Sequence, residues 1–179
     1  NVVDEANLKV SNSPTNGYSL VARSGNTGGM TWEAPAGGGK IGQVIYGSTT
    51  SAYNSTSASY TDTGLTAAIT PSATSSKVIV LFTQAGDFIN PDSNGTSRTS
   101  YLATFRGSTE IAGQKQECKY GFGGYEVPIS FSGSILDSPN TTNATTYKTM
   151  AKIDNASGQS LSFQIGTSRS QMILMEVLA

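Results

Sequence analysis

The sequence predicts an all-β protein, and three observations support that class. Ser and Thr are abundant and there are 20 Gly, whereas Leu, Glu and Lys, which favour helices, are sparse. Several segments alternate apolar and polar side chains with the two-residue period of a strand. Clusters of Gly, Pro, Asn, Asp and Ser separate these segments. We therefore expect an antiparallel two-sheet jelly-roll sandwich, preceded by an extended N-terminal arm.

Three consecutive glycines, Gly37 to Gly39, divide the 179 residues unequally. We expect residues 1–39 to be an extended linker or shaft arm that ends in this Gly-rich hinge. Its few apolar side chains cannot offset the entropy of ordering the backbone, so the arm should be ordered only against neighbouring copies or an upstream shaft. Residues 40–179 should form the β head. Because the chain begins at Asn1 without Met, we also expect sequence upstream.

Eight segments of the head have the length and composition of strands. They are Ile41–Tyr46, Tyr60–Thr70, Lys77–Ala85, Ser100–Arg106, Val127–Leu136, Thr145–Asp154, Ser160–Ile165 and Gln171–Val177. Val78–Phe82 and Met172–Val177 are apolar at consecutive positions, which predicts that both of their faces are covered. One face would meet the core and the other a second subunit. The residues assigned to that oligomer interface are Met172, Leu174, Val78 and Val80.

Two loops are candidates for binding a receptor. Residues 86–98 are long for a hairpin connection, and residues 119–126 interleave aromatic side chains with glycine. Aromatic rings pack on sugars or apolar epitopes at low entropic cost. The alternative is that these rings cover the end of the head or a seam between subunits. The residues assigned to receptor binding are Phe88, Asn90, Asn94, Arg98, Tyr120, Phe122 and Tyr125.

Residue types that usually carry catalysis are scarce. The chain has no histidine, which removes Ser-His-Asp and Cys-His machinery and the commonest zinc ligand. Residues 92–95 resemble part of a calcium loop but lack its remaining ligands, so they predict a β-turn. Cys118 is the only cysteine and is interpreted as a free thiol. We expect no catalytic residue, no cofactor and no metal site. A pair of carboxylates for glycoside hydrolysis stays an open alternative.

Charge and hydropathy limit the partners. Eleven basic and twelve acidic residues give a net charge of −1, and no run of Lys or Arg exists, so nucleic-acid binding is not expected. The longest apolar run, Val78–Phe82, has the length of a strand, so membrane insertion is not expected.

Five stretches of the head resemble the C-terminal domain of tailed-phage tail-fibre and virion appendage proteins. They read GKIGQVIYGSTTS, ITPSATSSKVIVLF, FRGSTEIAGQ, GSILDSPNTTNATTYK and SQMILMEVLA. The segment VSNSPTNGYSLVARSGNTGGMTWEAP resembles the linker before such a terminal domain. The resemblance implies a trimeric head of the C1q and tumour-necrosis-factor type, a place in the virion and no enzymatic step. No site residue is transferred from it.

The sequence thus predicts a bacteriophage virion structural protein, a homotrimeric tail-fibre or appendage tip for host attachment. Its expected partners are other virion proteins, through the arm, and a host-surface glycan or protein. Three identical sites on one head would raise avidity. Two alternatives stay open: a capsid decoration or adaptor protein that binds no receptor, and a polysaccharide depolymerase.

Overall fold

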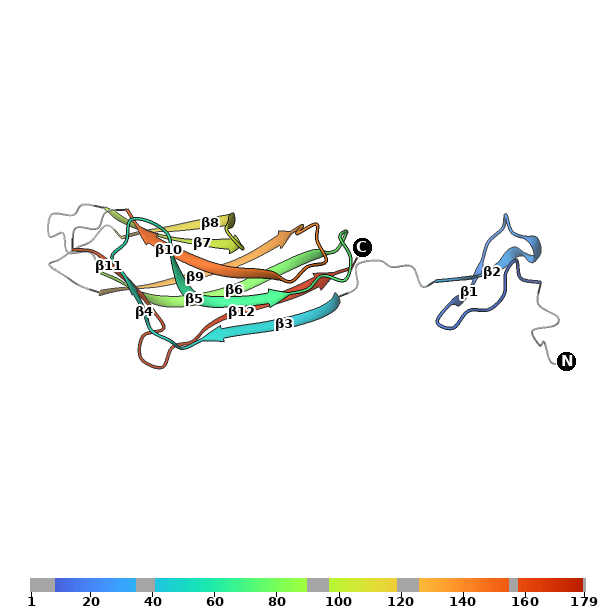
Figure 1. Cartoon of the computed structure of the whole chain (residues 1–179), viewed down its shortest axis with the longest axis horizontal. Helices are drawn as coiled ribbons and strands as arrows, with labels where there is room; N and C mark the ends of the chain where they lie inside the picture. Colours follow the sequence, from blue (N-terminus) through green and yellow to red (C-terminus); the bar gives the residue numbers. More distant parts are fainter. Residues whose placement is uncertain (1–8, 35–40, 90–96, 119–125, 155–157, 179) are drawn as a thin grey trace. The chain divides into compact units, whose positions relative to one another are not determined.

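The computed structural model describes residues 9–34, 41–89, 97–118, 126–154 and 158–178 (Figure 1). The chain divides into two compact units, Asn1–Lys40 and Ile41–Ala179. The described residues contain twelve β-strands, one short 3-10 turn at Thr27–Gly29 and no α-helix. The predicted all-β class is therefore confirmed, and every pairing between the strands is antiparallel.

The first unit contains a β-hairpin. Strand β1 (Ser19–Ala22) pairs with β2 (Met30–Glu33). The Asn12 side chain extends this pairing: its Oδ1 accepts a 2.7 Å hydrogen bond from the Trp32 amide, and its Nδ2 donates one of 2.7 Å to the Trp32 carbonyl. One side-chain amide thus satisfies both backbone groups of an edge residue. These hydrogen bonds order part of the first unit, which its small number of apolar side chains did not predict.

The second unit contains two sheets. The four-stranded sheet has the order β5 (Thr61–Ile69), β10 (Thr145–Ile153), β7 (Arg98–Arg106), β8 (Thr109–Cys118). The six-stranded sheet has the order β3 (Ile41–Thr49), β12 (Ser170–Val177), β6 (Lys77–Ile89), β11 (Ser160–Phe163), β4 (Tyr53–Ser55), with β9 (Glu126–Asp137) also paired to β6.

The long strand β6 organises the six-stranded sheet. Its first half pairs with β12 and its last residues pair with β11, while β9 pairs with its other edge over twelve positions. Strand β3 lies beside β12, with Ile41 opposite Val177. The chain therefore enters this unit at the same end at which β12 finishes, and β6 runs from that end to the opposite one.

One hydrophobic core joins the two sheets. Its members come from both, and Leu65, Leu102 and Tyr147 of the four-stranded sheet are fully buried with Val80 and Leu174 of the six-stranded sheet. These residues follow the two-residue alternation of their strands, so every second side chain enters the core.

A short chain of polar side chains crosses this core. Thr63 Oγ1 and Thr149 Oγ1 lie 2.6 Å apart, and Thr149 Oγ1 donates a 2.9 Å hydrogen bond to Gln84 Oε1. All three residues are buried. Because each hydroxyl has a partner, the polar atoms connect the sheets without an unmet hydrogen bond at either threonine.

Seven of the eight expected strands overlap observed strands closely, and β11 is shorter than Ser160–Ile165 because it ends at Phe163. Two observed strands of the second unit were not expected. β4 has only three residues, and β8 carries mainly polar side chains because it lies at an edge of its sheet. Edge strands commonly carry charged and polar residues, which weakens their apolar pattern.

Candidate functional site

The outer face of the six-stranded sheet carries the most prominent apolar surface of the described residues. On this face, Val44, Met175, Ile79 and Leu136 lie directly opposite one another across four strands. A second row next to it contains Tyr46, Ile173, Leu81 and Ser134. We call the seven apolar members of these two rows the outer apolar face: Val44, Tyr46, Ile79, Leu81, Leu136, Ile173 and Met175.

Solvent reaches much of this face. Val44 is 58% exposed, Tyr46 54% and Leu136 60%, whereas the four residues on the central strands are half-buried. Such a contiguous group of large apolar side chains costs free energy in water and commonly marks a contact surface.

The outer apolar face is not flat. An open hollow of about 430 Å³ lies over β6, between β9 and β12, and Leu81, Thr83 and Ile173 contribute to its wall. Ser132 and Ser134 line its β9 side. The hollow exists because these short side chains stand beside the bulkier leucine and isoleucine. A side chain from another molecule could fill it.

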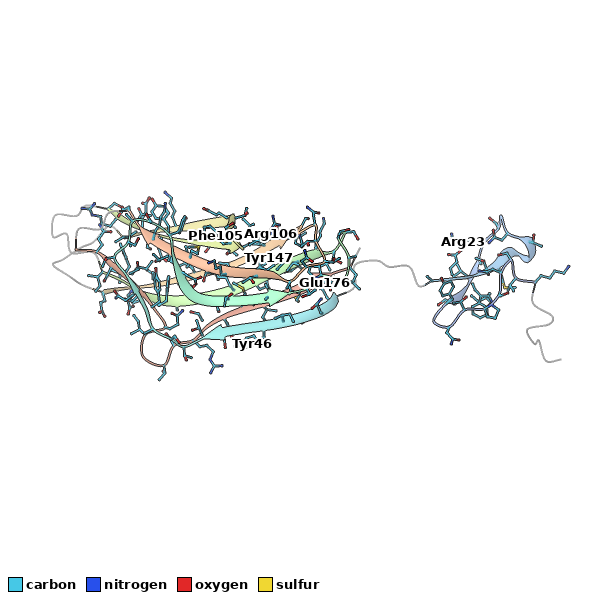
Figure 2. The ribbon with its side chains drawn as sticks, viewed as in Figure 1. Arg23, Tyr46, Phe105, Arg106, Tyr147 and Glu176 are labelled. Carbon is cyan, nitrogen blue, oxygen red and sulfur yellow. The ribbon has the colours of Figure 1, made fainter. Side chains whose placement is uncertain are left out.

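Polar groups lie along one margin of this face. Gln171 and Thr83 form the next cross-strand pair beyond Ile173 and Leu81. A hydrogen bond from Ser48 and then one from Arg169 lower the pKa of the Tyr46 hydroxyl, which also lies 3.4 Å from Gln171 Oε1. Figure 2 shows Tyr46 on β3, at the margin of the sheet. An apolar surface bordered by polar groups is common in protein–protein contacts.

The four residues assigned to an oligomer interface from the sequence are in the core instead. Val78, Val80, Met172 and Leu174 are fully buried within the unit, so this assignment is corrected. In a strand, neighbours in sequence face opposite sides, and the outward partners of these residues are Ile79, Leu81, Ile173 and Met175. The strands were identified correctly, but the wrong set of alternating positions was chosen.

The strands that flank the two predicted receptor loops end close together. Ile89 at the end of β6 pairs with Glu126 at the start of β9, and Arg98 at the start of β7 pairs with Cys118 at the end of β8. This end of the unit is opposite the one where the chain enters at Ile41, because β6 begins at the entry end and runs away from it. Both predicted loops therefore connect strands at the end farthest from the chain entry.

The structure places the residues assigned to receptor binding in different environments. Phe88 lies in β6 and is fully buried in the core, so its ring cannot contact a receptor, and that assignment is corrected. Arg98 begins β7, is half-buried and is engaged by another residue. Five further assigned residues lie outside the described part of the chain: Asn90, Asn94, Tyr120, Phe122 and Tyr125.

Glu176 is a buried carboxylate at the entry end of the unit. Its Oε1 accepts hydrogen bonds of 2.6 Å from the Ser72 amide and 2.7 Å from the Ser72 hydroxyl, and its Oε2 accepts one of 2.8 Å from Gln43 Nε2. Burial raises the pKa of this carboxyl, but the hydrogen bonds outweigh burial and lower the pKa to about 2. The residue stays ionised at neutral pH and ties β12 to β3 and to the segment after β5.

A second charged group joins the two sheets near the same end. Arg106 Nη1 lies 2.8 Å from both carboxylate oxygens of Asp137, and the buried Tyr147 hydroxyl donates a 2.6 Å hydrogen bond to Asp137 Oδ2. Burial and the neighbouring carboxylate raise the pKa of Tyr147 well above its ordinary value. Figure 2 shows Arg106 and Tyr147 on adjacent strands of the four-stranded sheet. These hydrogen bonds connect β9 of the six-stranded sheet to β7 and β10 of the four-stranded sheet.

Several of the described carboxylates are ion-paired or hydrogen-bonded to neighbouring residues. Asp62 pairs with Lys148, Glu117 with Lys115, and Asp154 accepts a hydrogen bond from the Thr99 amide. Within the described ranges, no group of three or more His, Cys, Asp or Glu side chains could hold a metal ion. Those same ranges contain no helix long and apolar enough to cross a membrane.

Comparison with known proteins adds no family assignment. No protein-family model matches the chain, and no curated protein matches it.

Proposed function

We propose that this protein is a virion structural protein whose β head assembles as a homotrimer and forms the tip of a tail fibre or similar appendage of a bacteriophage. The observation that carries the proposal is the outer apolar face of the six-stranded sheet. Two further copies of the chain are its proposed occupants. Placing these faces around a three-fold axis would remove their apolar surface from water.

The arrangement of the strand ends supports this choice of partner. The chain enters the head at one end, where Ile41 pairs with Val177, and the predicted receptor loops join strands at the other. Three copies packed side by side would present all three N-terminal segments at one end and all three loop sets at the opposite end. That is the polarity required of a tip joined to a shaft.

The strand order supports a jelly-roll sandwich as the architecture of the head. If the eight longest head strands, β3, β5 to β10 and β12, are numbered one to eight, one sheet reads 1-8-3-6 and the other 2-7-4-5. The first and last strands are thus neighbours, and the chain passes repeatedly between the sheets. Jelly rolls combine two Greek keys in this manner.

Attachment to a host surface is the role proposed for the trimer. Three identical sites carried on one rigid head would bind a repetitive surface with an avidity far above that of a single site. The resemblance of the sequence to appendage proteins supports the same role. The proposal includes no catalytic step, and four of the described carboxylates are ion-paired or hydrogen-bonded within the head: Asp62, Glu117, Asp137 and Glu176.

Two experiments test this proposal. An antibody against the protein, located by electron microscopy on intact particles, should label the distal end of the tail or of another appendage. Purified full chain should adsorb to host cells and compete with infection. Labelling spread over the capsid lattice, together with a failure to adsorb, would overturn the proposal and support a decoration protein.

A further inference from the structure

The outer face of the four-stranded sheet differs in chemistry from the outer apolar face. On it, Lys152 of β10 lies directly opposite Tyr101 of β7, and Tyr101 lies opposite Lys115 of β8. Tyr60 immediately precedes β5 and reaches the same group. The Lys152 Nζ lies 4.6 Å from the centre of the Tyr60 ring and 5.2 Å from that of Tyr101. Two aromatic rings therefore hold one ammonium group.

Lys152 differs from the other lysines of this sheet. Lys148 Nζ lies 3.0 Å from Asp62, and Lys115 Nζ lies 3.2 Å from Glu117. Among the described residues, no carboxylate forms an ion pair with Lys152. Its charge is positioned by the tyrosine rings, which attract the ammonium but do not neutralise it.

The surroundings hold this group in place. The Tyr60 ring packs edge-on against Phe105 with 5.5 Å between their centres. Beside them, Ala103 is almost fully buried and pairs with Gly113, and a side chain at Gly113 would meet the Glu110 carboxylate. Tyr101, Ala103, Phe105 and Lys152 all belong to hydrogen-bonded strands. Sites carried on strands keep their geometry better than sites on loops.

An acceptor lies close to the same group. Burial raises the pKa of the Tyr60 hydroxyl, and the negative charge of Glu110 raises it further. Glu110 is exposed and pairs with Phe105 across the sheet. The cluster thus offers aromatic carbon, an unpaired ammonium and a nearby carboxylate to solvent.

We propose that Tyr60, Tyr101 and Lys152 form a binding site for an acidic pyranose saccharide. A sugar ring presents one face of C–H groups, which packs on an aromatic ring, and Lys152 is placed to bind a carboxylate of the sugar. Glu110 can accept hydrogen bonds from neighbouring hydroxyls. A neutral sugar would leave the lysine without a charged partner, which is why the site favours an acidic one.

The site deepens the proposed function and rests on it, since a surface polysaccharide is one class of attachment receptor. It also lies on the sheet that the proposed trimer leaves free. Three copies of the site would remain open to solvent around the outside of the head while the outer apolar faces are buried.

Binding is tested with the full chain and two acidic probes, oligogalacturonate and oligoglucuronate, followed by saturation-transfer NMR and calorimetry. At least one should bind, with transfer to its ring C–H protons. Its methyl-esterified form, which masks the carboxylate alone, should bind about tenfold more weakly or worse. Lys152→Gln and Tyr101→Ala should each lower the affinity by a similar factor. Lys148→Gln, on the same strand and face, is the matched control and should leave it unchanged.

The site is overturned if neither probe binds, if the ester binds as tightly as the acid, or if Lys152→Gln binds as tightly as the native chain. The experiments distinguish a failure of the saccharide site from a failure of the proposed attachment function. If Lys152→Gln loses the probe but still adsorbs to cells like the native chain, the site is not the receptor contact and attachment stands. If the native chain does not adsorb at all, the attachment function fails, whatever the probes show.

Discussion

Ile173 of β12 and Leu81 of β6 lie directly opposite each other, and both face away from the core. Their immediate neighbours in sequence, Met172 and Phe82, also form a cross-strand pair, but these two belong to the core. One pair of strands therefore supplies two apolar surfaces, one that packs in the core and one that faces outward.

The outer apolar face predicts that a charge placed on it prevents assembly. Met175→Glu puts a carboxylate in the middle of the row formed by Val44, Met175 and Ile79. Burying that charge between subunits would cost several kcal/mol. Size-exclusion chromatography with light scattering should show the variant as a monomer.

Met150→Glu is the matched control for this substitution. Met150 is a half-buried methionine on the outer face of the other sheet, with Lys148 and Lys152 on the same face of its strand. This variant should keep the mass of the native protein. Equal dissociation of both variants would mean that added charge, and not its location, disrupts the assembly.

Because the two surfaces of β12 differ, shortening two side chains that are neighbours in sequence should have different effects. Leu174→Ala removes a fully buried side chain and should lower the free energy of unfolding by about 2–5 kcal/mol. Ile173→Ala should destabilise the isolated subunit much less but weaken its self-association. Denaturant unfolding measured at several protein concentrations separates these effects. Leu174→Ala should be less stable than the native chain at every concentration, with the native dependence on concentration, whereas Ile173→Ala should change that dependence because its self-association is weaker. A concentration dependence in Ile173→Ala equal to that of the native chain would contradict the division into core and contact surfaces.

Glu176 predicts a defined loss of stability in acid. Its folded pKa of about 2 lies below the value near 4.3 expected in the unfolded chain. The native state thus releases this proton more readily, so the stabilisation is fully present above about pH 4.5 and is lost as pH falls toward 2. Glu176→Gln should cost about 1–3 kcal/mol at pH 7 and remove this part of the acid dependence. Parallel pH profiles for the variant and the native chain would show that Glu176 is not the responsible group.

Trp32 is the only tryptophan, so its fluorescence should report the unfolding of the N-terminal unit separately from that of the head. Asn12→Ala removes the side chain that hydrogen-bonds both backbone groups of Trp32. Trp32 fluorescence should then change at lower denaturant concentration, while the far-ultraviolet circular dichroism of the β head keeps its midpoint. A joint shift of both signals would contradict the independence of the two units.

The sequence identified most strands because their apolar alternation survives in the folded protein. It did not reveal which face of β6 and β12 is buried, and the reason is physical. Lys77 and Thr83 mark the outer positions of β6, but Gln84 occupies an inner one and is buried by its contact with Thr149. The only charge of β12, Glu176, is buried as well. Because polar side chains occupy both the inner and the outer positions of these strands, their pattern did not show which face points into the core.

The tyrosine and lysine cluster was missed for a different reason. Tyr60, Tyr101 and Lys152 come from three separate segments, and their proximity depends on the pairing of β7 with β10 and on the residue before β5. No spacing within one segment encodes it. The first predicted loop, residues 86–98, was too long, because β6 continues to Ile89 and β7 begins at Arg98. The strands that flank both predicted loops end at the same end of the head.

The solution mass of the full chain tests the central claim most directly. Light scattering at micromolar concentration should give three times the 18.6 kDa of one chain, and the trimer should dissociate on introduction of Met175→Glu. A mass of 18.6 kDa for the native protein under the same conditions would contradict the account, because the outer apolar face would then be exposed without a second copy to cover it.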